Sequence, residues 1–264
     1  MTREFRKDIR GRGASSNIPN RFDSLQYEAE PQDFDNYLEE DKPRLLTEVF
    51  KDSSRTIIAK NDSPDIGFTY SLNAYRGCEH GCAYCYARPT HEYLGMSAGL
   101  DFESKIFVKE EAPELLREAL MKKSWQPDIV MMSGVTDCYQ PLERKFQLTR
   151  RCLEVFNEFK NPVGIITKNA LITRDIDILS EMAKWNGVVV YLSVTTLDDD
   201  LCGVLEPRTS RPRSRLNAIK KLADAGITVG VNVGPTILGL TDQDRKSTRL
   251  NSSHTDISRM PSSA

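Results

Sequence analysis

Residues 78–85 read CEHGCAYC, which places three cysteines in the spacing C-x3-C-x2-C. They follow shortly after an apolar run, Phe68–Leu72, which we expect to form a strand. A tight loop after a strand can turn three such thiolates toward one centre. Cysteine thiolates hold iron–sulfur clusters, and a cubane held by only three of them leaves one iron open for another ligand. The spacing therefore predicts a [4Fe-4S] cluster on Cys78, Cys82 and Cys85.

The open iron points to a second cofactor. The amino and carboxylate groups of S-adenosylmethionine can chelate such an iron, so that one electron breaks the sulfonium C–S bond and yields a carbon radical. The electron has to come from outside, so we expect a flavodoxin-like or ferredoxin-like protein as electron donor. Gly77 and Gly81 flank and interrupt the motif and allow the backbone to wrap closely around the cluster.

A structural zinc site is the main alternative interpretation of the same residues. It would use the three thiolates with His80 or His91 as a fourth ligand. Structural zinc sites favour two separated ligand pairs over one triplet, which weighs against this alternative. Disulfides between such close cysteines are disfavoured in a reducing compartment.

Composition indicates a globular protein of one main domain. Of the 264 residues 39% are hydrophobic and 28% are charged, and the net charge is −2. Such a charge gives no global attraction to nucleic acid or membranes. No apolar run reaches membrane-spanning length, and the polar, Arg-rich start Met1–Gly13 has no signal-peptide core. We therefore predict a cytoplasmic location and no membrane partner.

Three regions follow one another along the chain. Residues 1–66 are polar, with scattered glycine and proline, and predict an irregular N-terminal extension. Residues 67–244 alternate apolar strands with helical patterns, as α/β proteins with a parallel sheet do. Residues 245–264, rich in Ser, Thr and Arg, resemble a translated sequencing adapter, so we expect a non-native tail. The core would then stop after its sixth strand, without the covering helix.

The predicted elements of the core have definite ranges. The strands are Phe68–Leu72, Lys105–Lys109, Asp128–Met132, Val163–Thr167, Val188–Val194 and Ile227–Val233. The helices are Pro113–Lys123, Arg144–Phe159, Asp175–Trp185 and Arg215–Ala225. Right-handed crossovers make the sheet parallel, either open or curled toward a barrel, with ligands at the carboxyl ends of the strands.

The remaining cysteines carry different expectations. Cys152 falls on the apolar face of its helix and Cys202 in a short helical turn, and both are interpreted as structural. Cys138 follows the third strand at the ligand-binding end. We keep two alternatives for it, a hydrogen-atom donor to a radical and an ordinary loop cysteine.

With these residues in hand, the chain resembles the radical SAM superfamily over residues 71–244. Within it, the resemblance is to DNA repair photolyase-like proteins, relatives of spore photoproduct lyase. The phrases that carry it are SLNAYRGCEHGCAYCYARPTHEYLG (71–95), SGVTDCYQPLE (133–143), IITKN (165–169), YLSVTT (191–196), LEPRTSRPRSR (205–215) and VNVGPTILGLTD (231–242).

The resemblance implies a partial (βα)6 barrel of the TIM type with the cluster at its mouth. It also implies that Tyr84 lies against the adenine, and that Asp137, Lys168 and Ser193 contact the cofactor. Taken alone, Asp137 reads as a turn residue and Lys168 as a surface charge. Glu206 is interpreted either as a clamp on the ribose or as half of an ion pair.

Two features depart from the lyase pattern. Gly134 stands where the lyase has its hydrogen-donor cysteine, and the loop 235–242 is a loose version of the family's glycine-rich phrase. Spore-lesion repair is therefore in doubt, although radical generation is not.

The substrate hypothesis is a damaged or modified nucleobase. Nucleic-acid binding would use Arg208, Arg211, Arg213 and Arg215, unless these form a solvated loop with internal ion pairs. The competing hypotheses are a non-enzymatic binding module stabilised by zinc or a cluster, and an inactive truncated fragment.

Overall fold

The computed structural model describes residues 11–22, 45–64 and 66–242. Its main sheet has the strand order β2-β3-β6-β7-β8-β9. Strand β2 is antiparallel to β3, and all the other neighbouring strands are parallel. The strand bounds are β2 Ile58–Lys60, β3 Tyr70–Leu72, β6 Val130–Met132, β7 Val163–Thr167, β8 Val188–Ser193 and β9 Thr228–Asn232. The predicted tail 245–264 and parts of the predicted extension lie outside the described residues.

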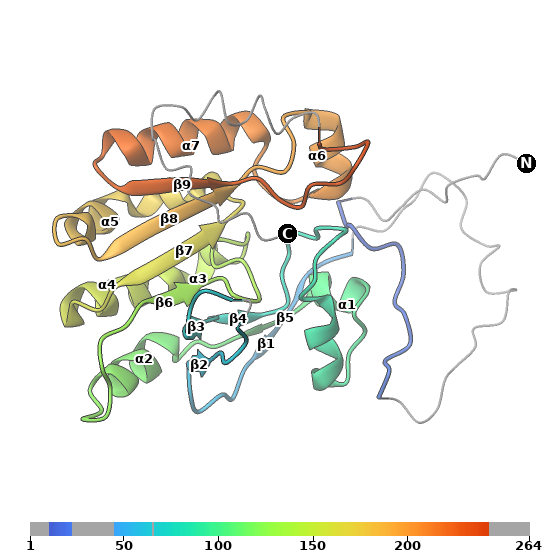
Figure 1. Ribbon diagram of the computed structural model, residues 1–264. Helices are drawn as coiled ribbons and strands as arrows, with labels where there is room; N and C mark the ends of the chain where they lie inside the picture. Colours follow the sequence, from blue (N-terminus) through green and yellow to red (C-terminus); the bar gives the residue numbers. More distant parts are fainter. Residues whose placement is uncertain (1–10, 23–44, 65, 243–264) are drawn as a thin grey trace, which may run out of the picture.

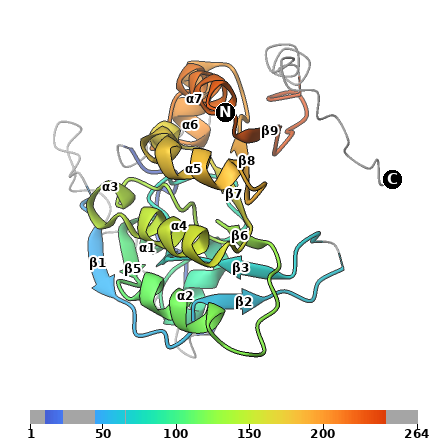
Figure 2. The ribbon, with the colours of Figure 1, turned by 90° about the vertical axis from the view of Figure 1, so that its left-hand side faces the viewer.

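Helices lie in a row along one side of the sheet (Figures 1 and 2). They are α2 Ala112–Leu120, α4 Leu148–Phe159, α5 Ile176–Ala183 and α7 Pro212–Asp224. Their apolar faces meet the strands in one core, in which Leu116, Leu153, Leu179 and Leu222 are fully buried. This alternation of strand and helix confirms the predicted α/β class. None of the helices in the described ranges is long and apolar enough to cross a membrane.

The central strands explain why the site forms where it does. In β7 and β8 the side chains of Val163, Ile165, Val190 and Leu192 are fully buried, and burial of each contributes about 1.5–3 kcal/mol. The carboxyl ends of the parallel strands all point to the side where α6 (Asp199–Leu205) and α1 (Leu100–Ser104) lie, at the right of Figure 1. Residues that follow these strands are therefore gathered on one side of the molecule.

One predicted strand of the main sheet belongs to another sheet. β5, Lys105–Val108, pairs with β1 (Glu48–Lys51) and β4 (Tyr75–Arg76) in a separate three-stranded sheet. Its side chains alternate between buried and half-buried, which is the pattern of a strand with one covered face rather than two. The described main sheet therefore has five parallel strands, and the predicted sixth strand is the fifth of them. The (βα)6 count stays a prediction.

The helix predicted at Arg144–Phe159 is interrupted. The short helix α3, Glu143–Phe146, ends at Gln147, whose φ of 51° lies in the left-handed region, and α4 begins at the next residue. Both carboxylate oxygens of Glu143 accept the Thr149 N–H at 3.1 Å, so Glu143 satisfies an N–H group in the first turn of α4. This capping contact gives the chain a reason to break there.

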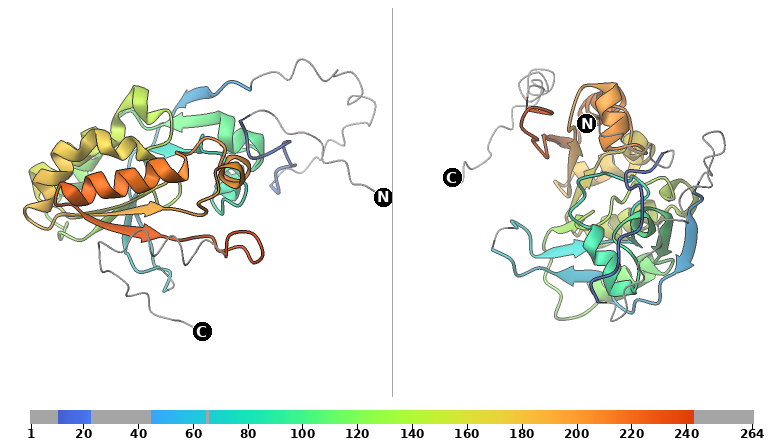
Figure 3. Two further views of the ribbon diagram at one scale, coloured as in Figure 1. Left: turned by 90° about the horizontal axis from the view of Figure 1, so that it is seen from above. Right: turned by 90° about the vertical axis from the view of Figure 1, so that its right-hand side faces the viewer.

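Described parts of the predicted N-terminal extension pack into the fold. β1 is a strand of the three-stranded sheet and β2 is a strand of the main sheet. Residues 11–22 run along α1 (Figure 3, right). The side chains of Arg12 and Asn20 are only 6% and 4% exposed. The domain boundary at residue 66 stays a prediction.

Candidate functional site

The cysteine loop, residues 77–86, follows β3 and β4 on the side of the carboxyl ends. Its cysteines are free thiols, and Cys78 and Cys82 are buried while Cys85 is half-buried. The Cys78 N–H donates to the Phe102 carbonyl at 2.9 Å, and the Cys85 N–H donates to the Cys82 carbonyl at 3.2 Å. The loop is thus folded on itself and tied to α1.

Two glycines give the loop its tight path. Gly77 and Gly81 have φ of 81° and 65°. A Cβ on Gly77 would lie 2.9 Å from the Phe102 carbonyl oxygen, and one on Gly81 would lie 2.7 Å from Glu103 Oε2. The backbone therefore approaches α1 more closely than a side chain at either position would allow. Wrapping around a cluster stays a prediction.

The thiols suit a group that binds thiolates. Burial raises the pKa of Cys78 well above its usual range. Burial also raises the pKa of Cys82 to about 12, although Lys168 acts in the opposite direction. Such thiols stay protonated on their own and ionise when they coordinate a metal centre. Burial raises the pKa of the core thiols in the same way, so what fits an iron–sulfur cluster is the donor set, three free thiols in one short loop.

A single zinc ion fits less well. Within residues 11–22, 45–64 and 66–242, no three His, Cys, Asp or Glu side chains are grouped to hold one metal ion. His91 Nε2 lies 3.0 Å from the Lys105 carbonyl, and His80 Nδ1 lies 3.2 Å from Asp137 Oδ2. A cubane binds each thiolate on a different iron, so its cysteines need not converge on one point.

Asp137 joins three segments of the site. Its carboxylate accepts the Thr167 hydroxyl at 2.7 Å and the Lys168 N–H at 2.8 Å. Burial alone would raise the pKa of Asp137, but His80 and these hydrogen bonds lower it to about 2. The carboxylate thus connects the loop after β6 with the end of β7 and with the cysteine loop. The Thr167 hydroxyl and the Lys168 N–H are both donors, as an ionised carboxylate needs.

Tyr84 enters a buried network with Glu206 and Arg215. Its hydroxyl donates to Glu206 and lies 3.0 Å from Thr195 Oγ1. Glu206 Oε2 pairs with Arg215 Nη2 at 2.5 Å, and neither side chain is more than 1% exposed. Burial would raise the pKa of Glu206, but Arg215 lowers it. Of the two interpretations of Glu206, the structure contains the ion pair.

Lys168 and Ser193 complete the predicted cofactor set. Lys168 Nζ lies 5.9 Å from the centre of the Tyr84 ring. Ser193 ends β8, and its carbonyl accepts from Arg215 Nη1 at 2.9 Å. The fold therefore connects all four predicted cofactor residues to one network beside the cysteine loop. Their roles stay predictions.

Cys138 faces the core and not the cysteine loop. It is 2% exposed and packs in the main hydrophobic cluster, which also contains Tyr75 and Cys152. Burial raises the pKa of its thiol well above the usual range. This environment supports the interpretation of Cys138 as a structural residue. Cys152 and Cys202 are also buried, as expected.

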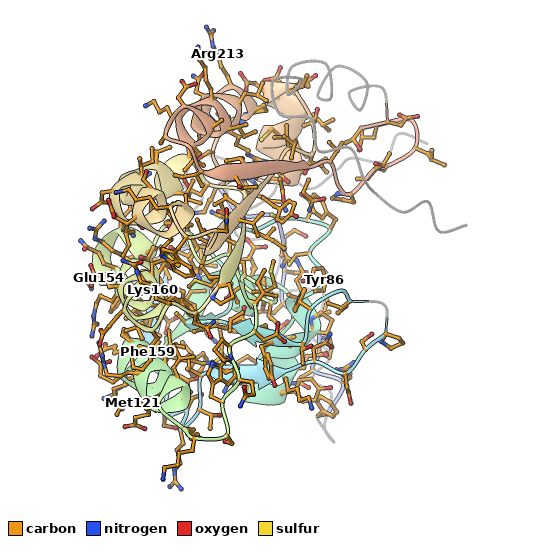
Figure 4. All side chains as sticks on the ribbon, turned by 60° about the vertical axis from the view of Figure 1, so that its left-hand side comes forward. Tyr86, Met121, Glu154, Phe159, Lys160 and Arg213 are labelled. Carbon is orange, nitrogen blue, oxygen red and sulfur yellow. The ribbon has the colours of Figure 1, made fainter. Side chains whose placement is uncertain are left out.

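The four arginines of residues 208–215 do not form one basic patch. Arg208 pairs with Glu79 at 3.0 Å, and Arg215 is the buried partner of Glu206. Arg211 Nη1 donates to the Asp199 carbonyl at 2.7 Å, while Arg213 points away from the fold (Figure 4). Arg208 and Arg215 thus form internal ion pairs, as the alternative interpretation expects, although Arg213 and Arg215 lie in α7 and not in a loop. Phosphate binding stays a prediction.

Tyr86 connects the cysteine loop with the loop after β6. Its ring is 79% exposed, and its hydroxyl donates to the Gly134 carbonyl at 2.5 Å. Figure 4 shows it on the opposite side of the molecule from Glu154 and Lys160. Gly134, which stands in place of the lyase cysteine, therefore lies next to Tyr86, the residue that follows Cys85.

Sequence reasoning missed several residues of the site. Thr195 donates to Glu206 at 2.7 Å, and its place after β8 was a usable signal. His80 was considered only as a zinc ligand, although its ring faces Asp137. Glu103 gave no signal, because its partners come from residues 13–14 and 88, far from it in the sequence.

Comparison with known families decides the classification. The model of the radical SAM superfamily matches residues 72–250, a range that contains the three cysteines and the four predicted cofactor residues. The chain belongs to the radical SAM superfamily. The resemblance drawn from the sequence phrases is thereby confirmed.

Two relatives of this radical SAM chain carry the description "uncharacterized protein". A protein of Mycobacterium tuberculosis is 37% identical over 175 residues, which cover 66% of the chain and 52% of the relative. One of Methanocaldococcus jannaschii is 31% identical over 67% of the chain and 63% of the relative. The chain thus spans about half the length of the mycobacterial relative.

Solved structures support the fold. Spore photoproduct lyase complexed with dinucleoside spore photoproduct superposes with a TM-score of 0.59 at 17% identity, covering 79% of this chain and 58% of the lyase. A cysteine-to-serine mutant of spore photoproduct lyase gives a TM-score of 0.53 at 19% identity, over 71% of this chain and 51% of that one. At these identities the likeness concerns the fold alone.

Proposed function

We propose that the chain is a radical SAM enzyme in which Cys78, Cys82 and Cys85 hold a [4Fe-4S] cluster. The observation that carries the proposal is the arrangement of three free thiols in one tight loop, at the carboxyl ends of parallel strands, within the matched radical SAM range. When bound, the cluster supplies an electron that cleaves S-adenosylmethionine to a 5'-deoxyadenosyl radical.

The surrounding residues would bind and orient S-adenosylmethionine. Tyr84 offers a ring that its hydroxyl fixes to Glu206, and Lys168 brings a cation to that ring. Asp137 holds the backbone of Lys168, just after β7, in place. Ser193 ends β8, the strand that pairs with β7. These contacts keep the polar groups in fixed positions, which is what the protein contributes to cofactor chemistry.

Anaerobic reconstitution with iron and sulfide tests the proposal. The full chain is expected to bind about four irons and, after reduction with dithionite, to convert S-adenosylmethionine to 5'-deoxyadenosine and methionine. Metal analysis and product chromatography are the measurements. Zinc in the protein without iron, or iron without any cleavage, would contradict the function and support the binding-module alternative.

For the substrate we propose a nucleic acid with a damaged or modified base. The support is the fold shared with spore photoproduct lyase, whose solved complex contains a dinucleoside photoproduct. We also propose an external flavodoxin-like or ferredoxin-like electron donor. The cytoplasm, which keeps cysteines reduced, is the proposed location.

Ultraviolet-irradiated DNA provides a test of this substrate class. We expect it to accelerate the consumption of S-adenosylmethionine by the reconstituted enzyme relative to unirradiated DNA of the same sequence, because a bound substrate consumes the radical. Equal rates with irradiated DNA, unirradiated DNA and no DNA would exclude this lesion class.

A further inference from the structure

Glu103 is a fully buried carboxylate between three segments of the chain. Its Oε2 accepts the Gly13 N–H at 2.9 Å, and its Oε1 accepts the Ala14 N–H at 2.9 Å. Its Oε1 also accepts Arg88 Nη2 at 2.5 Å. Because all three partners are donors, the site requires an ionised carboxylate and no other side chain of this size satisfies it.

Arg88 carries the connection from Glu103 to the cysteine loop. Its Nε and Nη2 donate to the Cys82 carbonyl at 3.2 and 2.8 Å, and its Nη1 donates to the Gly99 carbonyl at 3.1 Å. The guanidinium thus fixes the backbone of the middle cysteine against α1. Loss of Glu103 would leave this guanidinium without its carboxylate partner.

Residues 12–14, which we call the N-terminal strap, lie directly on the cysteine loop. A Cβ on Gly13 would come within 1.7 Å of the Gly81 carbonyl oxygen. Arg12 Nη1 donates to the Glu103 carbonyl at 2.5 Å, and its Nη2 donates to the Leu45 carbonyl at 2.8 Å. Glu103 therefore holds the strap twice: its side-chain carboxylate accepts from Gly13 and Ala14, and its backbone carbonyl accepts from Arg12.

We propose that Glu103 is a positioning residue that holds the N-terminal strap and Arg88 on the cysteine loop, and so keeps Cys82 enclosed and in place. This role rests on the proposed function, because Glu103 would hold in place a cysteine that binds the cluster. It also predicts a property of the cluster-free chain. The strap touches the backbone on both sides of Cys82, at Gly81 and Ala83, so we expect its opening to loosen this backbone and expose the Cys82 thiol without unfolding the core.

Alkylation of the cluster-free protein tests the proposal with Glu103→Gln. The amide NH2 faces only donors, so the strap opens more often. We expect N-ethylmaleimide to modify Cys82 about tenfold faster, equivalent to ~1.4 kcal/mol, while Cys152 in the core reacts at the wild-type rate. Peptide mass spectrometry measures both rates in the same molecules.

A second variant removes the effect of charge on thiol reactivity. Gly13→Ala forces the strap off Gly81 without changing any charge, and is expected to accelerate Cys82 in the same way. The controls are Glu143→Gln, which alters an equally buried carboxylate in another network, and Gly67→Ala, where a Cβ meets open space. Neither control should change the Cys82 rate. Unchanged Cys82 rates in both test variants, or equal acceleration of Cys82 and Cys152, would overturn the proposal.

Cluster retention separates this inference from the proposed function. In reconstituted protein, Glu103→Gln should release iron to a chelator about tenfold faster than wild type, again ~1.4 kcal/mol. A wild-type chain that binds no iron would refute the proposed function but leave the alkylation result standing. Equal iron release from wild type and variant would refute the positioning role.

Discussion

Replacing Cys82 with Ala is expected to reduce the iron content of the reconstituted protein from about four per chain to background, and to abolish cleavage of S-adenosylmethionine. A cubane with only two protein thiolates lacks an anchor for a second iron, and the buried loop offers no other free thiol in place of Cys82 within the described residues. Cys78→Ala and Cys85→Ala should behave alike. Iron analysis and anaerobic absorption spectra measure the loss.

Alanine at Cys152 and at Cys138 provides matched controls. Both thiols are buried in the main core, a different hydrophobic cluster from the one with Cys78 and Cys85, so both variants should retain the iron and the cleavage activity. Stability falls somewhat in each, because a buried side chain is shortened. A Cys82→Ala protein that keeps its iron, or a Cys152→Ala protein that loses it while still folded, would contradict the assignment of ligands.

Arg215→Ala is expected to lower the free energy of unfolding by about 3–5 kcal/mol. The substitution leaves Glu206 charged in a fully buried position, where the donors that remain are the Tyr84 and Thr195 hydroxyls and, at 3.9 Å, the weakly donating Cys202 thiol. It also removes the donors to the Ser193 and Ser210 carbonyls. Urea denaturation followed by circular dichroism measures the change.

The double variant Arg215→Ala with Glu206→Gln shows whether the pair is the cause. If the uncompensated charge dominates, the two changes together destabilise the protein less than the sum of the single changes. Arg117→Ala is the control, because Arg117 pairs with Glu158 on the exposed surface and its loss should leave stability almost unchanged. Additive effects of the two buried substitutions would refute the coupling.

Local patterns made part of this molecule predictable. The cysteine spacing identified the loop, and the continuous apolar runs located β7 and β8, because strands covered on both faces read that way. The family resemblance named Asp137, Lys168 and Ser193, and the carboxyl-end rule expects all three at the same edge of the sheet.

Long-range contacts explain what the sequence could not reveal. Lys105–Val108 was correctly expected to be a strand, but its partner β1 lies in a segment whose polar composition gave no sign of it. Arg215 was grouped with its charged neighbours, although its partner Glu206 requires it to be buried. Glu103 reads as one acidic residue of a short helix, and only the folded chain shows that it meets residues 13–14 and 88. Burial of paired charges depends on such contacts and leaves no periodic trace in the sequence.

The segment around α6 touches the cysteine loop in several places, and this has a consequence for biosynthesis. The Ala83 N–H donates to the Leu205 carbonyl at 2.9 Å, and the Arg208 N–H donates to the His80 carbonyl at 3.3 Å. A ribosome therefore releases the three cysteines long before it has made the residues that hold their loop in shape. Domains fold as units during synthesis, so the cysteine loop takes its final shape only after the residues around position 208 have left the exit tunnel. The segment around α6 therefore completes the loop well after its three cysteines have been made.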